Sequence, residues 1–254
     1  MTEQIEVLIT HAFDEDQAAR LQSVSPRLKL RIRPVRKAEE IPPDLWKKAE
    51  ILYTNRTLPT PEQAPELAWI QFHSAGVEFA LDAPILQKQD LVATSLSGAS
   101  VGQVAEYIVM MLLALGRHLP ELMDLQRKVE WPRERWERFM PQELANSIVG
   151  IVGYGSIGRQ TARLLYGLGA QVLATKKDAM HPEDTDYTPE GMGDPRGEYV
   201  HRLYPAQALK SMVRECDFVV VTVPLTENTH SLIGDEELAA FKPGAFLVDV
   251  SRGG

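Results

Sequence analysis

The chain has 254 residues, of which 44% are hydrophobic and 24% are charged, the composition of an ordinary globular protein with one or two domains. Its formal net charge of −8 argues against a nucleic-acid partner, because phosphate backbones are bound by basic surfaces. The single cysteine, Cys216, excludes an internal disulfide, and we expect it to be a small core residue in a reducing compartment. The opening residues are acidic rather than basic, so no secretory signal is expected and the predicted location is the cytoplasm.

The first hundred residues alternate short strand and helix patterns. Apolar, β-branched runs predict strands at residues 5–10, 28–33, 51–54, 67–72 and 91–94. Acidic residues open a predicted helix at 14–21. The alternation predicts a small α/β domain with a parallel sheet. A row of cations on the strand at 28–33 is interpreted as a solvated strand face rather than an anion-binding patch.

A stretch of small residues at 95–100 precedes a long helix that begins near Val101. We place the domain boundary there, with one domain at residues 1–99 and the other at 100–254. The helix contains the most apolar run of the chain, residues 107–115, which is too short to span a bilayer. It is expected to be a buried or interface helix, and no membrane partner is predicted.

A G-x-G-x-x-G hexapeptide at residues 153–158 lies between a β-branched strand pattern and an amphipathic helix, and a second strand is predicted at 171–175. The hexapeptide alone is a weak signal, but this context is typical of a dinucleotide-binding βαβ unit. Gly153 permits a tight turn, Gly155 lets the backbone approach a pyrophosphate, and Gly158 lets helix and strand pack closely. The helix start offers N–H groups to the phosphates. The alternative is a glycine-rich turn without a ligand.

The end of the second strand bears on the choice of dinucleotide. An acidic residue there would accept hydrogen bonds from the ribose 2′-hydroxyl of NAD. This chain has Lys176 and Lys177 instead, followed by Asp178. Two ammonium groups attract a 2′-phosphate, so NADP is favoured over NAD. The alternative is that both lysines are solvated charges at a strand end.

Two further apolar runs, residues 218–223 and 245–250, predict central parallel strands. Residues 180–204 are polar and predict a long loop near the adenosine end of the cofactor. Because ligands bind beyond the carboxyl ends of parallel strands, Val223-Pro224 and Ser251-Arg252 are expected to border the cofactor site.

The order of these motifs resembles the D-isomer-specific 2-hydroxyacid dehydrogenases along almost the whole chain. Besides the glycine hexapeptide, the matching segments are Ser74–Glu78, Val104–Glu106, Val223–Thr229 and Leu247–Gly253. The resemblance implies a Rossmann-type doubly wound parallel sheet, incomplete at its C-terminal end, and a smaller flavodoxin-like α/β substrate domain. It also implies an oxidoreductase that transfers a hydride between NAD(P)H and a 2-keto acid or D-2-hydroxy acid, and a homodimer formed through the helix after the domain crossover.

The resemblance also assigns roles to residues of this chain. The backbone amides of Ala75 and Gly76 would hold the substrate carboxylate. Arg252 would be the catalytic arginine that orients a 2-keto acid and polarises its carbonyl, tasks that suit a fixed positive charge with forked donors. The pyrophosphate would be held by Gly153, Tyr154, Gly155, Ser156, Ile157 and Gly158. The adenosine side of the cleft would be lined by Val223, Pro224 and Thr229. No metal site is predicted.

Two features depart from the family pattern. Asp249 replaces the asparagine that is usual in the arginine motif, which is expected to weaken a local hydrogen bond. In the family a glutamate and a histidine that form the acid/base pair follow this arginine, and neither lies within the 254 residues. We therefore expect this chain to be impaired in catalysis, since loss of a general acid costs about 10²–10⁴-fold in rate. His73 is interpreted as a satisfied strand histidine rather than a substitute acid.

The alternative function is a non-catalytic dinucleotide-binding or sensing protein, the use that the C-terminal-binding-protein corepressors make of the same fold. Arg252 and the substrate loop favour the enzyme, whereas the missing acid/base pair favours the sensor. The side chains that select among 2-keto acids are not identified, so no single substrate is predicted.

Overall fold

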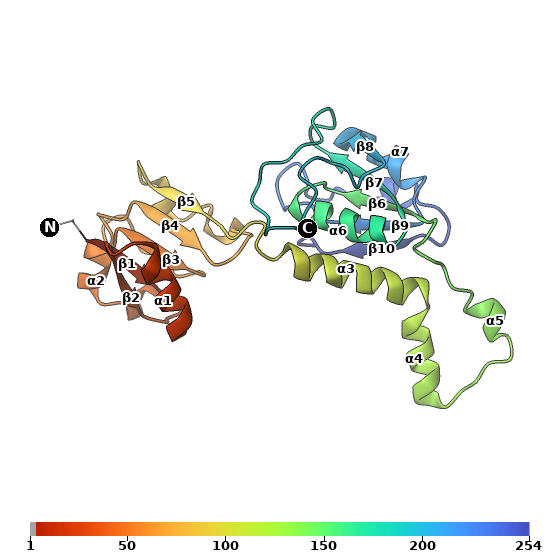
Figure 1. Cartoon of the computed structure of the whole chain (residues 1–254), viewed down its shortest axis with the longest axis horizontal. Coiled ribbons are helices and arrows are strands. Elements are labelled where there is room, and N and C mark those ends of the chain that lie inside the picture. The colour runs from red at the N-terminus through yellow and green to blue at the C-terminus, as the bar shows by residue number, and fades with distance from the viewer. Residues whose placement is uncertain (1–3, 254) are drawn as a thin grey trace. The chain divides into compact units, whose positions relative to one another are not determined.

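The computed structural model describes residues 4–253, which form two compact units divided between Ser97 and Gly98. Each unit contains a five-stranded parallel sheet, so the chain is an α/β protein with two such sheets (Figure 1). The division lies close to the expected boundary at 99/100.

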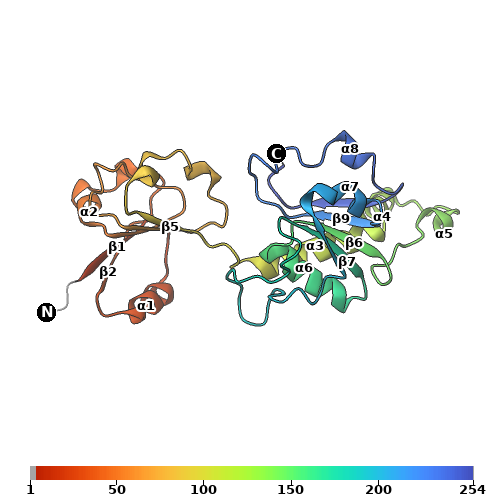
Figure 2. The same cartoon turned by 90° about the horizontal axis from the view of Figure 1, so that it is seen from above.

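Unit 1 has the strand order β2-β1-β3-β4-β5. Its strands are β1 (Ile5–Ile9), β2 (Leu28–Ile32), β3 (Ile51–Thr54), β4 (Trp69–Phe72) and β5 (Val92–Thr94). Its helices are α1 (Glu15–Val24) and α2 (Pro43–Lys48), with short 3₁₀ turns η1 (Ala38–Glu40), η2 (Glu78–Ala80) and η3 (Pro84–Gln87). In Figure 2, α1 lies on one face of the sheet and α2 on the other. After β2 the chain returns past β1 to form β3, so the winding direction reverses between β1 and β3.

The core of unit 1 is built around the inward-facing residues of β3 and β4. Leu52, Ile70 and Phe72 are fully buried and pack in one cluster with Trp46 of α2. The indole N–H of Trp46 donates to the carbonyl of Ala38 at 3.1 Å, so this polar atom is satisfied in the core. The cluster holds α2 against the sheet of unit 1.

The cations of β2 face solvent, as the interpretation of a solvated strand face requires. Lys29 and Arg31 both pair with the carboxylate of Glu6 on β1, at 2.5 and 3.3 Å. Since the side chains of both cations are more than a third exposed, these ion pairs contribute little to stability.

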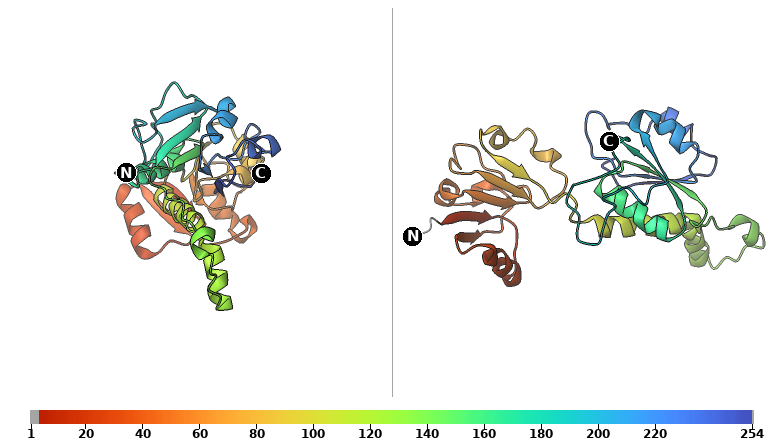
Figure 3. Two further views of the ribbon diagram at one scale, coloured as in Figure 1. Left: turned by 90° about the vertical axis from the view of Figure 1, so that its right-hand side faces the viewer. Right: turned by 45° about the horizontal axis from the view of Figure 1, so that its top comes forward.

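Unit 2 has the strand order β10-β9-β6-β7-β8, the arrangement of a Rossmann sheet (Figure 3). Its strands are β6 (Ile148–Val152), β7 (Gln171–Lys176), β8 (Arg202–Pro205), β9 (Phe218–Val221) and β10 (Phe246–Asp249). Its helices are α3 (Val101–Gly116), α4 (Leu119–Lys128), α5 (Arg135–Arg138), α6 (Ser156–Gly167), α7 (Leu209–Val213) and α8 (Asp235–Leu238), with the 3₁₀ turn η4 (Ala206–Ala208). The expectation of a loop over residues 180–204 is wrong at its end, where β8 begins.

The sheet of unit 2 is covered on both faces, which explains its unbroken apolar strands. Helices α3 and α6 cover one face and α7 the other (Figure 2). Successive residues of β9 alternate between the two cores, with Phe218 and Val220 toward α3 and α6 and Val219 toward α7. Cys216 is buried in the α7 core, as expected for a small core residue, and burial raises the pKa of its thiol to about 12.

Helices α4 and α5 project from the body of unit 2 (Figure 1). Their connecting segment exposes large apolar side chains, including Trp131 at 80% exposure. The run at residues 107–115 lies within α3, where Ile108 and Leu112 are buried while Met110 is 54% exposed. Within residues 4–253, none of the helices combines the length and apolar character needed to cross a membrane.

Candidate functional site

The glycine hexapeptide lies where the sheet of unit 2 reverses its winding direction. Strand β6 pairs with β7 on one side and with β9 on the other, and the hexapeptide follows the carboxyl end of β6. Open α/β sheets bind their ligands beyond the carboxyl ends of the strands at this point. The turn is therefore at the position where the topology itself predicts a site.

Each of the three glycines of the hexapeptide suits its position for a different steric reason. Gly153 has a φ of +104°, and a Cβ there would lie 2.8 Å from Cγ1 of Val223. A Cβ on Gly158 would lie 2.3 Å from the carbonyl oxygen of Gly153, so the helix packs directly on the turn. A Cβ on Gly155 would meet no atom of the described chain within 4 Å. Gly155 thus leaves an open backbone face at the turn, a cradle that a pyrophosphate fits.

The first turn of α6 is suited to an anion. Its N-cap residue is Gly155, which has no side chain to cap the helix, and the first turn contains no acidic residue. The N–H groups of Ser156, Ile157 and Gly158 have no acceptor within the helix, since the first N–H groups of a helix lie beyond its hydrogen-bonding pattern. Together with the helix dipole they favour phosphate oxygens.

Two threonines, at the ends of the two strands that flank β6, hold the turn in place. Thr175 of β7 accepts from the N–H of Gly153 through Oγ1 at 3.1 Å and from the N–H of Tyr154 through its carbonyl at 2.8 Å. Thr222, after β9, donates from Oγ1 to the carbonyl of Gly153 at 2.7 Å. Sequence reasoning missed both residues. The available signal was a hydroxyl residue at the ends of the two strands that flank β6.

The side chain of Tyr154 points away from the open face of the turn. It is 2% exposed, and its hydroxyl donates to Oδ2 of Asp194 at 2.5 Å. Burial, together with the bond to Asp194, raises the pKa of Tyr154 far above its ordinary value, so the phenol stays protonated. Tyr154 is therefore available to a cofactor only through its backbone.

A polar segment, residues 177–201, crosses from β7 to β8 and is here called the strap. Arg159 of α6 is 1% exposed, and its guanidinium anchors the strap to α6. The guanidinium donates to the carbonyls of Asp194 and Pro182 at 2.5 and 2.6 Å, and Nε lies 2.9 Å from the carboxylate of Asp184. The Nε–H has no aligned acceptor among the described residues, so the contact with Asp184 is ionic.

Asp194 is the second anchor of the strap. Its buried carboxylate accepts from the N–H groups of Glu198 and Tyr199 at 2.8 and 2.9 Å, in addition to the hydroxyl of Tyr154. Gln160 accepts from the N–H of Gly193 at 2.6 Å. These bonds hold the strap against the first two turns of α6, beside the glycine turn.

The two lysines at the end of β7 lie in different environments. The ammonium of Lys176 donates to the strap carbonyls of His181 and Glu183, the latter at 2.8 Å. Lys177 is exposed and has no ion pair or hydrogen bond within the described part of the chain. Asp178 accepts from Nδ1 of His181 at 2.7 Å, a bond that holds the pKa of this carboxyl below its usual value.

The other residues expected to border the cofactor crevice follow adjacent strands at the same edge of the sheet. The N–H of Val250 donates to the carbonyl of Val221 at 3.1 Å, so the pairing of β10 with β9 continues to Val250. Val223 and Arg252 therefore leave the sheet from neighbouring strands. Arg252 is exposed, and Asp249 accepts from the N–H and the hydroxyl of Ser251 at 2.7 and 2.6 Å. Asp249 thus has local hydrogen bonds of its own.

Pro224 and Thr229 belong to one closed turn. The hydroxyl of Thr229 donates to the carbonyl of Pro224, and its oxygen accepts from the N–H of Thr226 at 2.9 Å. The side chain of Thr229 therefore shapes the turn, which follows Val223.

The expected substrate loop lies in unit 1, after β4. The hydroxyl of Ser74 donates to the carbonyl of Gly76 at 2.8 Å, and the carbonyl of Ser74 accepts from Leu96 at 3.1 Å. The N–H groups of Ala75 and Gly76 donate to no acceptor in residues 4–253. They are two adjacent free donors, the requirement for binding a carboxylate.

His73 is satisfied by its neighbours. Its Nδ1 lies 2.6 Å from the hydroxyl of Tyr53, and its ring stacks on His11 with centroids 3.9 Å apart. Burial, and then the nearby His11, lower the pKa of His73. A histidine that resists protonation is a poor general acid, in agreement with its interpretation as a satisfied strand residue. No group of three or more His, Cys, Asp or Glu in the described chain is arranged to hold a metal ion.

Comparison with known proteins relates this geometry to one family. The family model described as "D-isomer specific 2-hydroxyacid dehydrogenase, NAD binding domain" matches residues 109–254. A glyoxylate reductase of Thermococcus gammatolerans is 28% identical over 196 residues, which cover 76% of this chain and 54% of the relative. An (S)-sulfolactate dehydrogenase of Chromohalobacter salexigens is 32% identical over 176 residues, 68% of this chain and 51% of the relative. The chain thus spans about half the length of these curated relatives.

Solved structures share the fold. A D-isomer-specific 2-hydroxyacid dehydrogenase family protein from Aeromonas salmonicida has a TM-score of 0.72 and 26% identity, covering 99% of this chain and 74% of that chain. A member from Xanthobacter autotrophicus, solved with NADPH and MES, has a TM-score of 0.72 and 23% identity, covering 98% of this chain and 73% of that chain.

Proposed function

Because the chain belongs to the D-isomer-specific 2-hydroxyacid dehydrogenase family of NAD(P)-dependent enzymes, we propose that its residues bind NADP(H) and orient a 2-keto acid for reduction to a D-2-hydroxy acid. The observation that carries the proposal is the open backbone face at Gly155, next to an uncapped helix start. When bound, the nicotinamide supplies the hydride.

The pyrophosphate is assigned to the backbone of the glycine turn. The N–H groups of Ser156 and Ile157 donate to its oxygens, and Gly155 allows the close approach. Thr175 and Thr222 keep the turn in this conformation before a ligand arrives, so little ordering cost is left for binding. Val223, Pro224 and Thr229 are assigned to the adenosine side of the cofactor cleft.

The preference for NADP over NAD is assigned chiefly to Lys177. Lys176 is occupied by two carbonyls of the strap, whereas Lys177 has a free ammonium at the strand end, where the adenosine ribose of a dinucleotide lies. A 2′-phosphate there would pair with Lys177. The Xanthobacter relative was solved with NADPH and a D-lactate dehydrogenase of Aquifex aeolicus with NAD, so the fold itself accommodates either cofactor.

The substrate is proposed to be a small 2-keto acid. The curated relatives include glyoxylate reductases, named for a small 2-keto acid, and a glycerate dehydrogenase, named for a small 2-hydroxy acid. The free N–H groups of Ala75 and Gly76 bind a carboxylate, and the guanidinium of Arg252 orients and polarises a keto group. The proton for the new hydroxyl requires a general acid, for which His73 is unsuited.

A polypeptide of these 254 residues is proposed to bind its cofactor well and to catalyse weakly. In the family the acid/base glutamate and histidine follow the arginine motif, and they lie outside residues 1–254. A chimaera in which Gly254 is followed by the corresponding segment of the Aeromonas relative is expected to gain about 10²–10⁴-fold in turnover. Equal turnover by both polypeptides would contradict this proposal.

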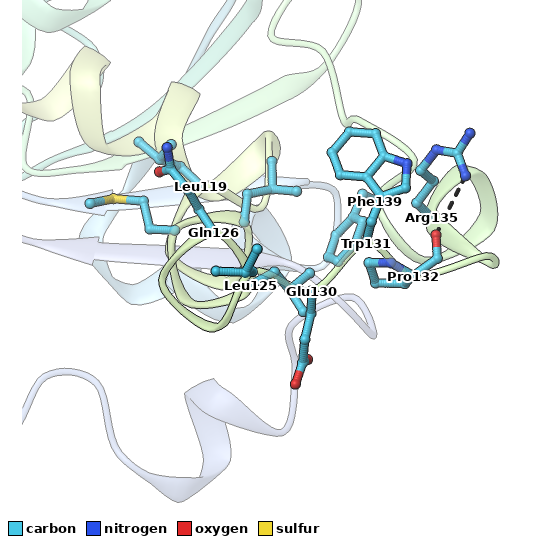
Figure 4. Close-up of a pocket in the computed structure, with 11 residues that line it drawn as sticks. Leu119, Leu125, Gln126, Glu130, Trp131, Pro132, Arg135 and Phe139 are labelled. Carbon is cyan, nitrogen blue, oxygen red and sulfur yellow. Dashed lines mark hydrogen bonds between the residues drawn. The ribbon is translucent and has the colours of Figure 1, made fainter.

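A homodimer through α3 and the α4–α5 projection is also proposed. One groove of about 760 Å³ lies along α3 and α6, where Met110 and Leu113 are exposed. A second, of about 550 Å³, lies between Leu125 of α4 and Trp131 (Figure 4). Such contiguous apolar surface favours burial against a partner, and a second copy of the chain fits because the family commonly dimerises here. Sedimentation as a monomer at micromolar concentration would reject it.

Titration of the protein with NADPH, followed by addition of glyoxylate, hydroxypyruvate or pyruvate, tests the proposal. Enhanced nicotinamide fluorescence on binding, and its slow loss with one of the acids, are expected. Binding without oxidation, in the chimaera as well as in the chain itself, would instead support the alternative of a dinucleotide sensor. Absence of binding would reject both.

A further inference from the structure

The end of β7 carries two side chains with opposite consequences for the choice of cofactor. Asp178 follows Lys176 and Lys177, and it lies about 20 residues after Gly158. At that distance from the glycine turn an acidic residue accepts hydrogen bonds from the adenosine ribose of NAD. The same carboxylate would repel the 2′-phosphate of NADP, which the neighbouring lysine attracts. The orientation of Asp178 therefore bears on which dinucleotide is bound.

Both carboxylate oxygens of Asp178 are bound within the strap. Oδ2 lies 2.7 Å from Nδ1 of His181, and Oδ1 accepts from the N–H of Met180 at 3.1 Å. The bond from His181 is the main reason why the pKa of this carboxyl is lowered, so Asp178 is held as a carboxylate. The strap, and not a ligand, thus sets the direction of this side chain.

The backbone around His181 keeps this pair together. The side chains of His181 and Asp178 are 76% and 58% exposed, so their bond on its own would be weak. However, the carbonyl of His181 accepts from the ammonium of Lys176, and the carbonyl of Glu183 accepts from the same ammonium at 2.8 Å. The imidazole is therefore carried by a segment that is tied to the end of β7.

Arg159 holds the same segment from the side of α6. Its guanidinium donates to the carbonyl of Pro182 at 2.6 Å and to that of Glu183 at 3.3 Å, and its Nε pairs with the carboxylate of Asp184 at 2.9 Å. Because Arg159 is 1% exposed, it is a fixed support for these carbonyls. His181 is thus positioned from two sides, so little ordering cost opposes its bond to the carboxylate.

We propose that His181 determines the cofactor preference by holding the carboxylate of Asp178 away from the adenosine ribose. Lys177 then pairs with a 2′-phosphate while the carboxylate is turned to the imidazole, and the ribose hydroxyls of NAD lose their acceptor. His181 is a positioning residue, because it acts through Asp178, and Arg159 and Lys176 support it through the backbone. This inference rests on the proposed function, since it takes a dinucleotide to be bound at the glycine turn.

The test is a double-mutant cycle with cofactor binding as its readout. Fluorescence titrations measure the affinities for NADPH and NADH of the unaltered protein, His181→Phe, Asp178→Asn and the double variant. His181→Phe releases the carboxylate, so the ratio of NADPH affinity to NADH affinity is expected to fall about tenfold, the equivalent of one charge-assisted hydrogen bond. Asp178→Asn alone is expected to change this ratio about twofold or less, because an exposed charge is screened. In the Asp178→Asn background the effect of removing His181 is expected to vanish, since no carboxylate is left to release.

His181→Asn is the matched control. Its amide N–H replaces Nδ1 as the donor to Asp178, so the ratio of the two affinities is expected to stay within about twofold of that of the unaltered protein. Thermal unfolding of each variant is measured in parallel, and the midpoints are expected to change little, because both side chains are exposed. A loss in His181→Asn as large as that in His181→Phe would overturn the proposal.

The cycle also separates this inference from the proposed function. If removal of His181 lowered the ratio equally with and without the Asp178 carboxylate, His181 would contact the 2′-phosphate itself and the proposal would be overturned. An unchanged ratio in His181→Phe, with both cofactors still bound, would overturn the inference and leave the proposed function standing. If the unaltered protein bound neither cofactor, the proposed function would fail and this inference with it.

Discussion

The Cβ position of Gly158 lies 2.3 Å from the carbonyl oxygen of Gly153, a distance that real side chains do not tolerate. The helix α6 therefore starts in direct contact with the turn that precedes it. This contact sets where the first N–H groups of the helix point, and it links the stability of unit 2 to the shape of the proposed cofactor site.

Gly158→Ala is expected to destabilise the protein by about 1–3 kcal/mol, because the methyl group forces the helix away from the turn. The matched control is Gly167→Ala in the same helix, where a Cβ would meet nothing within 4 Å. That control is expected to be neutral or slightly stabilising. Denaturant unfolding measures the stability of both variants. Equal unfolding midpoints for Gly158→Ala and Gly167→Ala would contradict the close contact between helix and turn.

The two lysines at the end of β7 are expected to respond differently to substitution. Lys177→Gln should lower the affinity for NADPH about tenfold and leave that for NADH nearly unchanged, since it removes one charge-assisted contact. Lys176→Met should weaken both cofactors by a similar factor, because it releases the strap carbonyls of His181 and Glu183. Fluorescence titrations with both cofactors measure the ratio. If the ratio of NADPH affinity to NADH affinity changed more in the Lys176 variant than in the Lys177 variant, the contact with the 2′-phosphate would belong to Lys176 instead.

Tyr154→Phe is expected to cost about 1.5–3 kcal/mol of unfolding free energy, the range for a hydrogen bond to a charged group. It leaves the buried carboxylate of Asp194 with one donor fewer. Tyr187→Phe is the control, since Tyr187 lies in the strap at 66% exposure. Thermal unfolding of both variants is the measurement, and an equal effect would show that the hydroxyl of Tyr154 does not anchor the strap.

Stability is expected to fall as the pH drops below 6.5, the ordinary pKa of histidine. The folded protein lowers the pKa of His73, so the unfolded chain binds a proton in this range that the folded chain does not. This contribution to the free energy of unfolding is fully present above the ordinary histidine pKa. It is lost as the pH falls through the lowered pKa of His73 in the folded protein. His73→Gln should flatten this part of the profile of unfolding free energy against pH, and an unchanged slope would exclude His73 as its source.

Most of the sheet of unit 2 could be predicted because its signals are local. β-Branched runs such as Ile148–Val152 are buried on both faces, and the glycine hexapeptide directly precedes its helix. Strand β8 gave no such signal, since its four residues, Arg-Leu-Tyr-Pro, contain no β-branched residue and no regular alternation, and they end in Pro205 at the edge of the sheet. Short edge strands are held by pairing with a neighbour rather than by their own composition.

The strap could not be predicted, for the opposite reason. Arg159 follows the hexapeptide on a helix, where an arginine is ordinarily solvated, yet it is buried by carbonyls at Pro182 and Asp194. These partners lie in a segment without periodicity, so no local pattern connects them with α6. Carbonyls of the same segment, those of His181 and Glu183, occupy Lys176, which the sequence presents as equivalent to Lys177.

The most direct test of the account is a calorimetric titration of NADPH into the unaltered protein and into Gly155→Asp. The turn at Gly155 has open space for a side chain, so the substitution should leave the unfolding midpoint nearly unchanged. Its carboxylate would occupy the position given to the pyrophosphate and should lower the affinity at least about tenfold. Saturable binding that is lost in the folded variant is the predicted result, and equal affinity in both proteins would contradict it.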